Sequence, residues 1–165
     1  RDLFVVECLT GVRYGDLMKI TKEYIFKDSI KIKVSKTGQV LHTLLLPTTK
    51  KILKKYNFIL PKISNSNYNK YIKEIGEIAC INQTVTQESY RSGKAVSFKR
   101  KKYQLITTHT ARRSFATNMY KKGYSPVQIM SITGHKKEST FLKYIRITNE
   151  ESVRMISLDY NKKVS

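Results

Sequence analysis

The alternation of apolar and polar residues along the chain predicts two short β-hairpins. Residues 30–35 alternate between an apolar and a polar side chain (Ile-Lys-Ile-Lys-Val-Ser), the pattern of a half-buried strand. The run at 36–39 (Lys-Thr-Gly-Gln) indicates a tight turn, and residues 40–46 indicate the returning strand. A second hairpin is predicted over residues 82–98, with an Arg-Ser-Gly-Lys tip at 91–94.

Most of the remaining chain carries apolar residues at the three- and four-residue spacing of amphipathic helices. One of these helices, starting at Thr108 or Thr110, should turn Ala111, Phe115 and Met119 toward the core. The predicted helices cover residues 2–10, 13–18, 47–56, 64–79, 108–122, 126–134, 139–147 and a last segment that begins with a capping box at 148–151. The fold class that follows is mainly α with small antiparallel β-hairpins (α+β).

The composition indicates a folded and strongly basic domain. The chain has 165 residues, of which 40% are hydrophobic, too many for an intrinsically disordered tail. No apolar run approaches the roughly 20 residues of a membrane span, so we expect no membrane partner. Lys and Arg number 32 against 12 Asp and Glu, which makes the formal net charge +20. Because solubility alone needs a net charge of only about 2–8, this excess favours a polyanionic partner, most simply nucleic acid.

The positive charge is concentrated in two long stretches without acidic residues. Residues 29–73 contain ten lysines, and residues 89–137 contain twelve lysines and arginines. Solvated helices usually interleave both signs, so we expect these stretches to form one phosphate-facing surface. The best candidates for contacts with a DNA backbone are Lys94, Lys99, Arg100, Lys101 and Lys102, followed by Lys50, Lys51, Lys54 and Lys55.

The two cysteines, Cys8 and Cys80, each follow apolar residues, and we expect both to be core residues rather than a disulfide or metal ligands. This usage favours a reducing, intracellular location. The chain opens with Arg1 directly in a helical pattern, so we expect it to be a piece of a longer protein.

A few residues could carry chemistry. His109 and Arg112 are three residues apart at a predicted helix start and therefore share a face. His135 follows a helix-ending glycine, and Tyr144 comes nine residues later. Two separated histidines with no nearby carboxylate or cysteine pair do not make a zinc site, so we expect no metal.

In combination, these residues resemble the signature of the tyrosine recombinases, the phage integrase family. The run at 109–112 (His-Thr-Ala-Arg), the Gly-His pair at 134–135 and Tyr144 stand in the family's order and at its separations. The run at 10–17 (Thr-Gly-Val-Arg-Tyr-Gly-Asp-Leu) is similar to the family's first-arginine box, with Asp where Glu is commoner. Lys36, in Lys-Thr-Gly, resembles the family's hairpin lysine.

The resemblance implies that residues 1–165 form a recombinase catalytic domain of the bacterial mobile-element type. Residues 149–165 would be its C-terminal helix and tail, and the helical core-binding domain of these enzymes would lie outside this chain. The implied partner is double-stranded DNA. The full-length protein would bind it as a homotetramer, with a monomer as the alternative for the isolated domain, in the bacterial cytoplasm at the nucleoid.

The resemblance also implies DNA cleavage and rejoining through a 3′-phosphotyrosyl intermediate, without metal, ATP or cofactor. The two arginines would hold the phosphate, His135 would hydrogen-bond one of its oxygens, and His109 would exchange the tyrosine proton. Lys36 would protonate the leaving oxygen, Asp16 would orient neighbouring groups, and Arg113 would contact the DNA backbone. The implied catalytic residues are Arg13, Lys36, His109, Arg112, His135 and Tyr144.

Some alternatives remain. Lys33 competes with Lys36 as the proton donor, and Tyr160 is the main rival of Tyr144. The fold could also serve a non-catalytic DNA-binding protein or a type IB topoisomerase-like strand transferase. The complete catalytic set and the short spacing from His135 to Tyr144 favour the recombinase.

Overall fold

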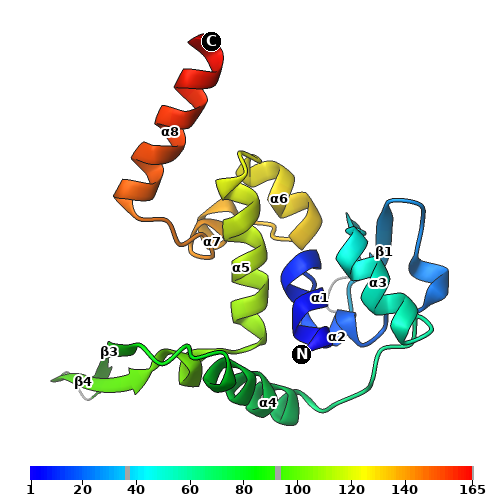
Figure 1. Cartoon of the computed structure of the whole chain (residues 1–165), viewed down its shortest axis with the longest axis horizontal. Coiled ribbons are helices and arrows are strands. Elements are labelled where there is room, and N and C mark those ends of the chain that lie inside the picture. Colours follow the sequence, from blue (N-terminus) through cyan, green and yellow to red (C-terminus); the bar gives the residue numbers. More distant parts are fainter. Residues whose placement is uncertain (36–37, 92–93, 165) are drawn as a thin grey trace.

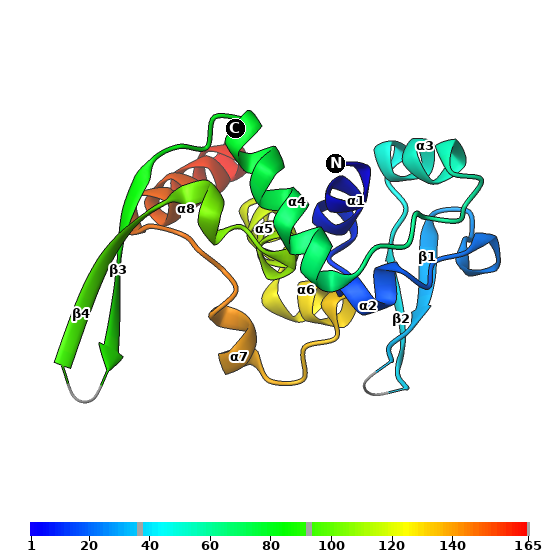
Figure 2. The ribbon, with the colours of Figure 1, turned by 90° about the horizontal axis from the view of Figure 1, so that it is seen from below.

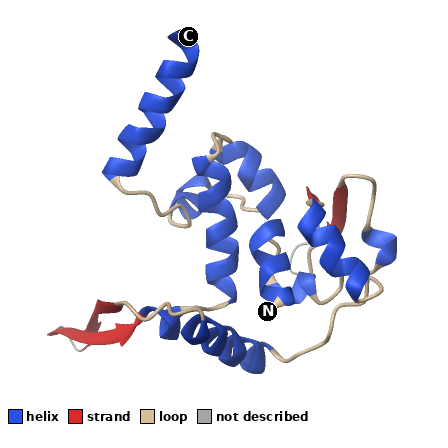
Figure 3. Cartoon of the chain, in the orientation of Figure 1, coloured by secondary structure: helices blue, strands red, loops and turns tan. Residues whose placement is uncertain are grey.

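A computed structural model describes residues 1–35, 38–91 and 94–164. Helices dominate the described residues, and four strands form two separate antiparallel hairpins, which confirms the predicted fold class (Figures 1 and 3). The elements are α1 (Asp2–Thr10), α2 (Tyr14–Leu17), the 3-10 helix η1 (Lys22–Tyr24), β1 (Ser29–Lys33), β2 (Val40–Leu44), α3 (Pro47–Lys55), α4 (Asn65–Ile78), β3 (Thr84–Arg91), β4 (Lys94–Lys101), the 3-10 helix η2 (Lys102–Leu105), α5 (Thr108–Lys121), α6 (Pro126–Thr133), α7 (Glu138–Leu142) and α8 (Asn149–Val164).

Helix α5 is the centre of the molecule and packs against α1 and α6. Its inward residues Ala111, Phe115 and Met119 are buried, as the spacing predicted. The turn after α1 approaches α5 so closely that a Cβ on Gly11 would lie 2.3 Å from the Phe115 ring. Gly11 also has a φ of 67°, a conformation that L side chains rarely adopt. Only glycine therefore fits where α1 ends against α5.

The first hairpin, β1–β2, lies against the turn after α1 and against α6. Strand β1 buries Ile30 and Ile32 and exposes the lysines between them, as the alternation predicted. The hydroxyl of Thr43 in β2 donates a 2.6 Å hydrogen bond to the carbonyl of Thr10. Leu41 lies so close to Gly134 that a Cβ there would be 2.7 Å from it. The hairpin is thereby fastened to the ends of both α1 and α6.

The second hairpin, β3–β4, extends away from the helical body (Figures 1 and 2). Helix α4 and η2 connect it to the body, because Gly76 in α4 packs against Ile106 at the end of η2. Its strands pair in register from Thr84 with Lys101 to Arg91 with Lys94. The hairpin is three residues longer at its C-terminal end than predicted, since the apolar alternation stops at Phe98 but the pairing continues to Lys101.

The C-terminal part differs from the prediction at one important point. The predicted helix at 139–147 is only α7, so Tyr144 lies beyond a helix end rather than inside a helix. The Thr117 hydroxyl in α5 lies 3.4 Å from the carbonyl of Tyr144 and accepts a 3.2 Å hydrogen bond from the Arg146 backbone. These contacts bind the chain to α5 where a longer helix would have continued.

Helix α8 begins at the predicted capping box, in which Thr148 and Glu151 exchange two 3.2 Å hydrogen bonds. It extends away from the body, and a salt bridge of 2.5 Å joins Lys121 of α5 to Glu151 (Figure 1). No helix in the described ranges has the length and apolar character needed to cross a bilayer.

Two smaller expectations were wrong. Cys80 is exposed, because it follows the end of α4 in a turn with a φ of 56°, whereas Cys8 is partly buried in α1. The cap of α5 is Thr107 rather than Thr108 or Thr110: the Thr110 hydroxyl accepts a 3.0 Å hydrogen bond from the Thr107 backbone.

Candidate active site

Arg112 is a deeply buried side chain of the site. Only 3% of it is exposed, and it lies in the first turns of α5. Nη1 donates a 2.6 Å hydrogen bond to the carbonyl of Gly11, and Nη2 donates to the carbonyl of Thr133. These two carbonyls terminate α1 and α6, so the guanidinium joins three helices and its position is set by the backbone.

Arg13, His109 and Arg112 line one cleft between α1, α2 and α5, as the sequence interpretation required. Arg13 caps the N-terminus of α2 and is half-buried, whereas His109 is exposed at the start of α5. The other lining residues are Glu7, Tyr14, Gly15, Asn65 and Thr108.

Several charged and ionisable side chains affect the pKa of Arg112. Burial, together with the positive charge of Arg13, lowers the pKa of Arg112 to about 10. Tyr144, Asp16 and Glu7 act on the same pKa in the opposite direction. Arg112 thus shares its surroundings with a second guanidinium, the tyrosine and two carboxyl groups.

His135 is fixed by the residue that ends α6. Its Nδ1 lies 2.8 Å from the Thr133 hydroxyl, which itself donates a 2.9 Å hydrogen bond to the carbonyl of Ile129. Because a hydroxyl has one proton, Nδ1 must be the donor to Thr133. Burial, together with the charges of Arg112 and Arg13, lowers the pKa of His135 to about 4. In the DNA-free protein, Nε2 of this neutral imidazole is therefore an unprotonated acceptor.

Tyr144 stands edge-on to His135, with 4.6 Å between the ring centroids. The Thr117 hydroxyl contacts the backbone at Tyr144 and at Arg146, and so holds the segment that carries Tyr144. Arg113 lies close by, because Tyr144 and Arg146 both affect its pKa, although burial contributes most to lowering it. The rival Tyr160 lies in α8, and its side chain is outside the described part of the structure.

The first hairpin reaches the same region. Lys36 lies outside the described residues, but its neighbour Ser35 is bound by Asp16 through its backbone amide at 3.0 Å and its hydroxyl at 2.8 Å. Lys19 donates a 2.7 Å hydrogen bond to the same hydroxyl. Beyond the turn, Gln39 borders a hollow together with His135. Ser35, at the end of the first strand, is therefore anchored to Asp16, and Gln39, before the second strand, borders the hollow next to His135.

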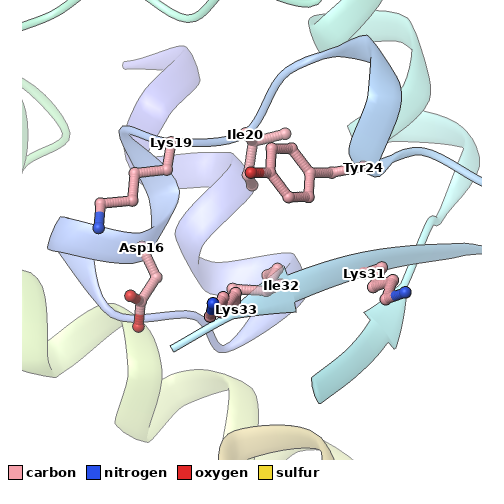
Figure 4. A pocket seen from close by; sticks show the side chains of 7 residues that line it. All are labelled: Asp16, Lys19, Ile20, Tyr24, Lys31, Ile32 and Lys33. Carbon is pink, nitrogen blue, oxygen red and sulfur yellow. The ribbon is translucent and has the colours of Figure 1, made fainter. Parts of the chain in front are cut away.

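Asp16 also lies at one end of a small pocket between α2 and β1 (Figure 4). Lys33, the alternative proton donor, lines this pocket together with Lys19 and Lys31. It does not line the cleft of Arg13 and Arg112.

The predicted DNA-binding residues lie apart from the cleft. Lys99, Arg100 and Lys101 are exposed on β4, Lys102 is exposed on η2, and nothing is described of the side chain of Lys94. The Arg100 guanidinium lies over the Phe98 ring, 4.9 Å from its centroid. Arg113, which the resemblance assigned to the DNA backbone, is half-buried.

Three residues of the site were not predicted. Thr133 orients His135, Ser35 joins the hairpin to Asp16, and Glu7 lies in the floor of the cleft. Only Glu7 has a signal in the sequence: it is a lone acidic residue inside the apolar run Phe-Val-Val-Glu-Cys-Leu at 4–9. In the described part of the chain, no three His, Cys, Asp or Glu side chains are grouped as a metal site.

Comparisons with known proteins agree with this geometry. Solved structures similar in fold include XerA recombinase (TM-score 0.70, 17% identity), aligned over 96% of this chain and 61% of that one. A second is XerH recombinase bound to a palindromic difH substrate (TM-score 0.67, 15% identity), aligned over 95% of this chain and 44% of that one. A third is a lambda integrase dimer bound to a COC′ core site (TM-score 0.62, 19% identity), aligned over 88% of this chain and 51% of that one.

This chain therefore spans between 44% and 61% of these three relatives. The comparison with curated protein sequences gives no match. The profile of the phage integrase family matches residues 1–151, which is nearly the whole chain. Together with the site geometry, that match shows that the chain belongs to the phage integrase family.

Proposed function

We propose that this chain is the catalytic domain of a site-specific DNA recombinase that cleaves and rejoins DNA through a covalent bond to Tyr144. The observation that carries the proposal is the meeting of Tyr144 with His135, 4.6 Å between ring centroids, beside the buried guanidinium of Arg112. Arg13 and His109 share a cleft with that guanidinium. These neighbours supply the groups that the proposal needs: a nucleophile, a proton acceptor and two cations that would hold a phosphate.

The cleavage step follows from these positions. The Tyr144 hydroxyl attacks the scissile phosphorus and passes its proton to His109, forming a 3′-phosphotyrosyl bond. The bond from phosphorus to the 5′-oxygen breaks, and Lys36 gives that oxygen a proton. Arg13 and Arg112 hold the non-bridging oxygens, supplying the positive charge that a metal ion provides in other phosphoryl transfers. The phosphotyrosyl bond keeps the energy of the broken bond, so rejoining needs no ATP.

His135 changes its protonation state in this scheme. In the free protein its Nε2 can only accept a hydrogen bond, as the Thr133 contact requires. A phosphate placed between the arginines adds negative charge beside the ring and raises the pKa of His135 from about 4. His135 then takes up a proton and donates from Nε2 to a non-bridging oxygen.

The test is a covalent adduct. A pool of nicked duplexes with randomised arms, in which the cleaved end diffuses away, is incubated with the protein, ideally at full length. Adducts that resist denaturing gel electrophoresis are sequenced to define a substrate. We expect Tyr144→Phe to abolish the adduct and EDTA to leave it unchanged, because the nucleophile is lost in the first case and no metal is used.

The matched control is Tyr124→Phe, which removes the same hydroxyl from an exposed position and should leave adduct formation intact. An adduct that survives Tyr144→Phe would refute the nucleophile. DNA binding without any adduct would support the non-catalytic alternative, and relaxation of supercoiled DNA without sequence preference would support the topoisomerase-like one.

A further inference from the structure

Glu7 is a buried acid in the floor of the active-site cleft, and the mechanism above does not use it. Only 1% of it is exposed, and it faces inward from α1, which packs against α5. Its carboxyl group accepts a 3.1 Å hydrogen bond from the hydroxyl of Tyr68, itself buried in α4. It lines the cleft together with Arg13 and Arg112.

Glu7 does not pair with either arginine. None of the salt bridges among the described residues includes it, and both terminal nitrogens of Arg112 donate to backbone carbonyls instead. An ionised carboxylate buried beside two guanidinium groups would be expected to bind one of them directly. A neutral carboxyl group needs no cationic partner, and one of its oxygens accepts the hydrogen bond from the Tyr68 hydroxyl.

The groups that face Glu7 come from four elements. Arg13 and Tyr14 approach from the start of α2, Tyr68 from α4, and His109 and Arg112 from α5, while Cys8 is its neighbour on α1. Burial raises the pKa of the Tyr68 hydroxyl and raises that of Cys8 to about 12, so both stay protonated near neutral pH. The positive charges near Glu7 are therefore those of the arginines that hold the phosphate.

A phosphodiester in this cleft needs those same charges. If Glu7 is ionised, its negative charge repels the phosphate and competes for the two arginines; if it is protonated, both arginines serve the phosphate alone. Burial raises the pKa of Glu7 to about 8, with the Tyr68 hydrogen bond and the charge of Arg112 acting in the opposite direction. The neutral form therefore predominates at pH 7.

We propose that Glu7 is a positioning residue whose neutral form leaves Arg13 and Arg112 free for the scissile phosphate, and whose ionisation expels that phosphate. This inference rests on the proposed function. It predicts that phosphate binding in the cleft is lost above the pH at which the Glu7 carboxyl group ionises. It also implies that bound DNA holds the proton on Glu7 more tightly, because each negative charge disfavours the other.

The test compares adduct formation by the wild type and Glu7→Gln at subsaturating DNA across pH. Every other ionisable group is present in both proteins, so the ratio of the two rates isolates Glu7. With a pKa of about 8, the ratio of variant to wild type should rise up to about 30-fold from pH 7 to 9.5 if the ionised form is inactive. Glu74→Gln, on the exposed surface of α4, should give a ratio that does not change with pH.

A second variant keeps the test decisive if Glu7→Gln folds poorly. Tyr68→Phe removes the hydrogen bond that favours the charged form, so its activity should persist to higher pH than that of the wild type. A ratio that stays constant with pH for Glu7→Gln, or a Tyr68→Phe profile shifted to lower pH, would overturn the proposal while leaving the recombinase assignment intact.

If the wild type forms no adduct at all, the recombinase assignment fails and a separate measurement decides for Glu7. Its carboxyl carbon, assigned in labelled protein by comparison with Glu7→Gln, is titrated by NMR with and without short duplex DNA. A midpoint that rises with DNA supports the proposal. A midpoint that is unchanged or lower contradicts it.

Discussion

At the scale of single residues, Arg112 both binds the ends of two helices and lines the candidate active-site cleft. Its guanidinium satisfies the terminal carbonyls of α1 and α6 and still presents positive charge to the cleft. A lysine cannot replace it, because an ammonium group is a compact charge without the planar fork that reaches two acceptors. The same side chain thus joins helix ends and takes part in the proposed phosphate clamp.

We predict that Arg112→Lys loses stability as well as activity. One of the two buried carbonyls is left without a donor, which should lower the free energy of unfolding by about 1–3 kcal/mol, measured by urea denaturation. Arg113→Lys, at the next position and without the two carbonyl contacts, is the matched control and should change stability by less than about 0.5 kcal/mol. Equal losses in the two variants would contradict the structural part of this assignment.

The sequence identified the candidate catalytic residues better than the residues that hold them in place. The positions of His109, Arg112 and Tyr144 could be inferred because their separations in the chain are characteristic. Thr133 and Ser35 could not, because a hydroxyl beside a catalytic residue has no pattern of its own, and its role depends on which element folds against it. Glu7 was visible as an anomaly, but only the packing of α1 on α5 places it in the cleft.

At the scale of elements, the helices were predictable where a local cap defines them, as at Ser125 and Thr148. The end of α7 was not, because a contact between distant segments decides it. Thr117 of α5 binds the backbone at Tyr144 and Arg146 and so ends the helical pattern early. Because α7 ends before Tyr144, the tyrosine lies outside the helix and stands beside His135. The local sequence pattern, which predicted a longer helix, does not give this position.

The same scale explains the role of Asp16. Its carboxylate reaches across from α2 and holds the hairpin at Ser35, one residue before Lys36. This carboxylate contacts no phosphate in the proposed mechanism; it fixes the residue next to the proposed proton donor. Asp16 is therefore a positioning residue for the hairpin.

We predict that Asp16→Asn slows cleavage because its weaker acceptor loosens the hairpin that carries Lys36. If the defect lies in proton donation, a substrate with sulfur in place of the 5′-bridging oxygen should restore the rate, since a thiolate leaves without an acid. Lys36→Ala should be rescued in the same way. Arg112→Lys is the control that should not be rescued, and a slow Asp16→Asn variant that sulfur fails to rescue would contradict a role through Lys36.

At the scale of the whole molecule, the two hairpins point to the same side, with α7 between them (Figure 2). Tyr144 follows α7, Lys36 belongs to the turn of the first hairpin, and the second hairpin carries exposed cations at 99–101. The net charge of +20 therefore includes a group of cations on the side where the catalytic elements lie. We place the DNA along this side, with the second hairpin contacting its backbone beyond the cleavage point.

This placement predicts that removing positive charge from β4 weakens DNA binding more than removing the same charge from α3. The triple variant Lys99→Gln, Arg100→Gln, Lys101→Gln should bind DNA more weakly, and the slope of log K against log salt should fall by up to about 3, because each lost phosphate contact removes about 0.9. The matched control is Lys50→Gln, Lys51→Gln, Lys54→Gln on α3. We expected these lysines to share one phosphate-facing surface with the second hairpin, but α3 lies on the opposite side in Figure 2. It removes the same charge, so a purely long-range attraction would weaken binding equally in both variants. Counterions are released only where cations meet phosphates. The salt slope of the α3 variant should therefore stay near that of the wild type. Equal slopes for the two variants would contradict the placement of DNA on the hairpin side.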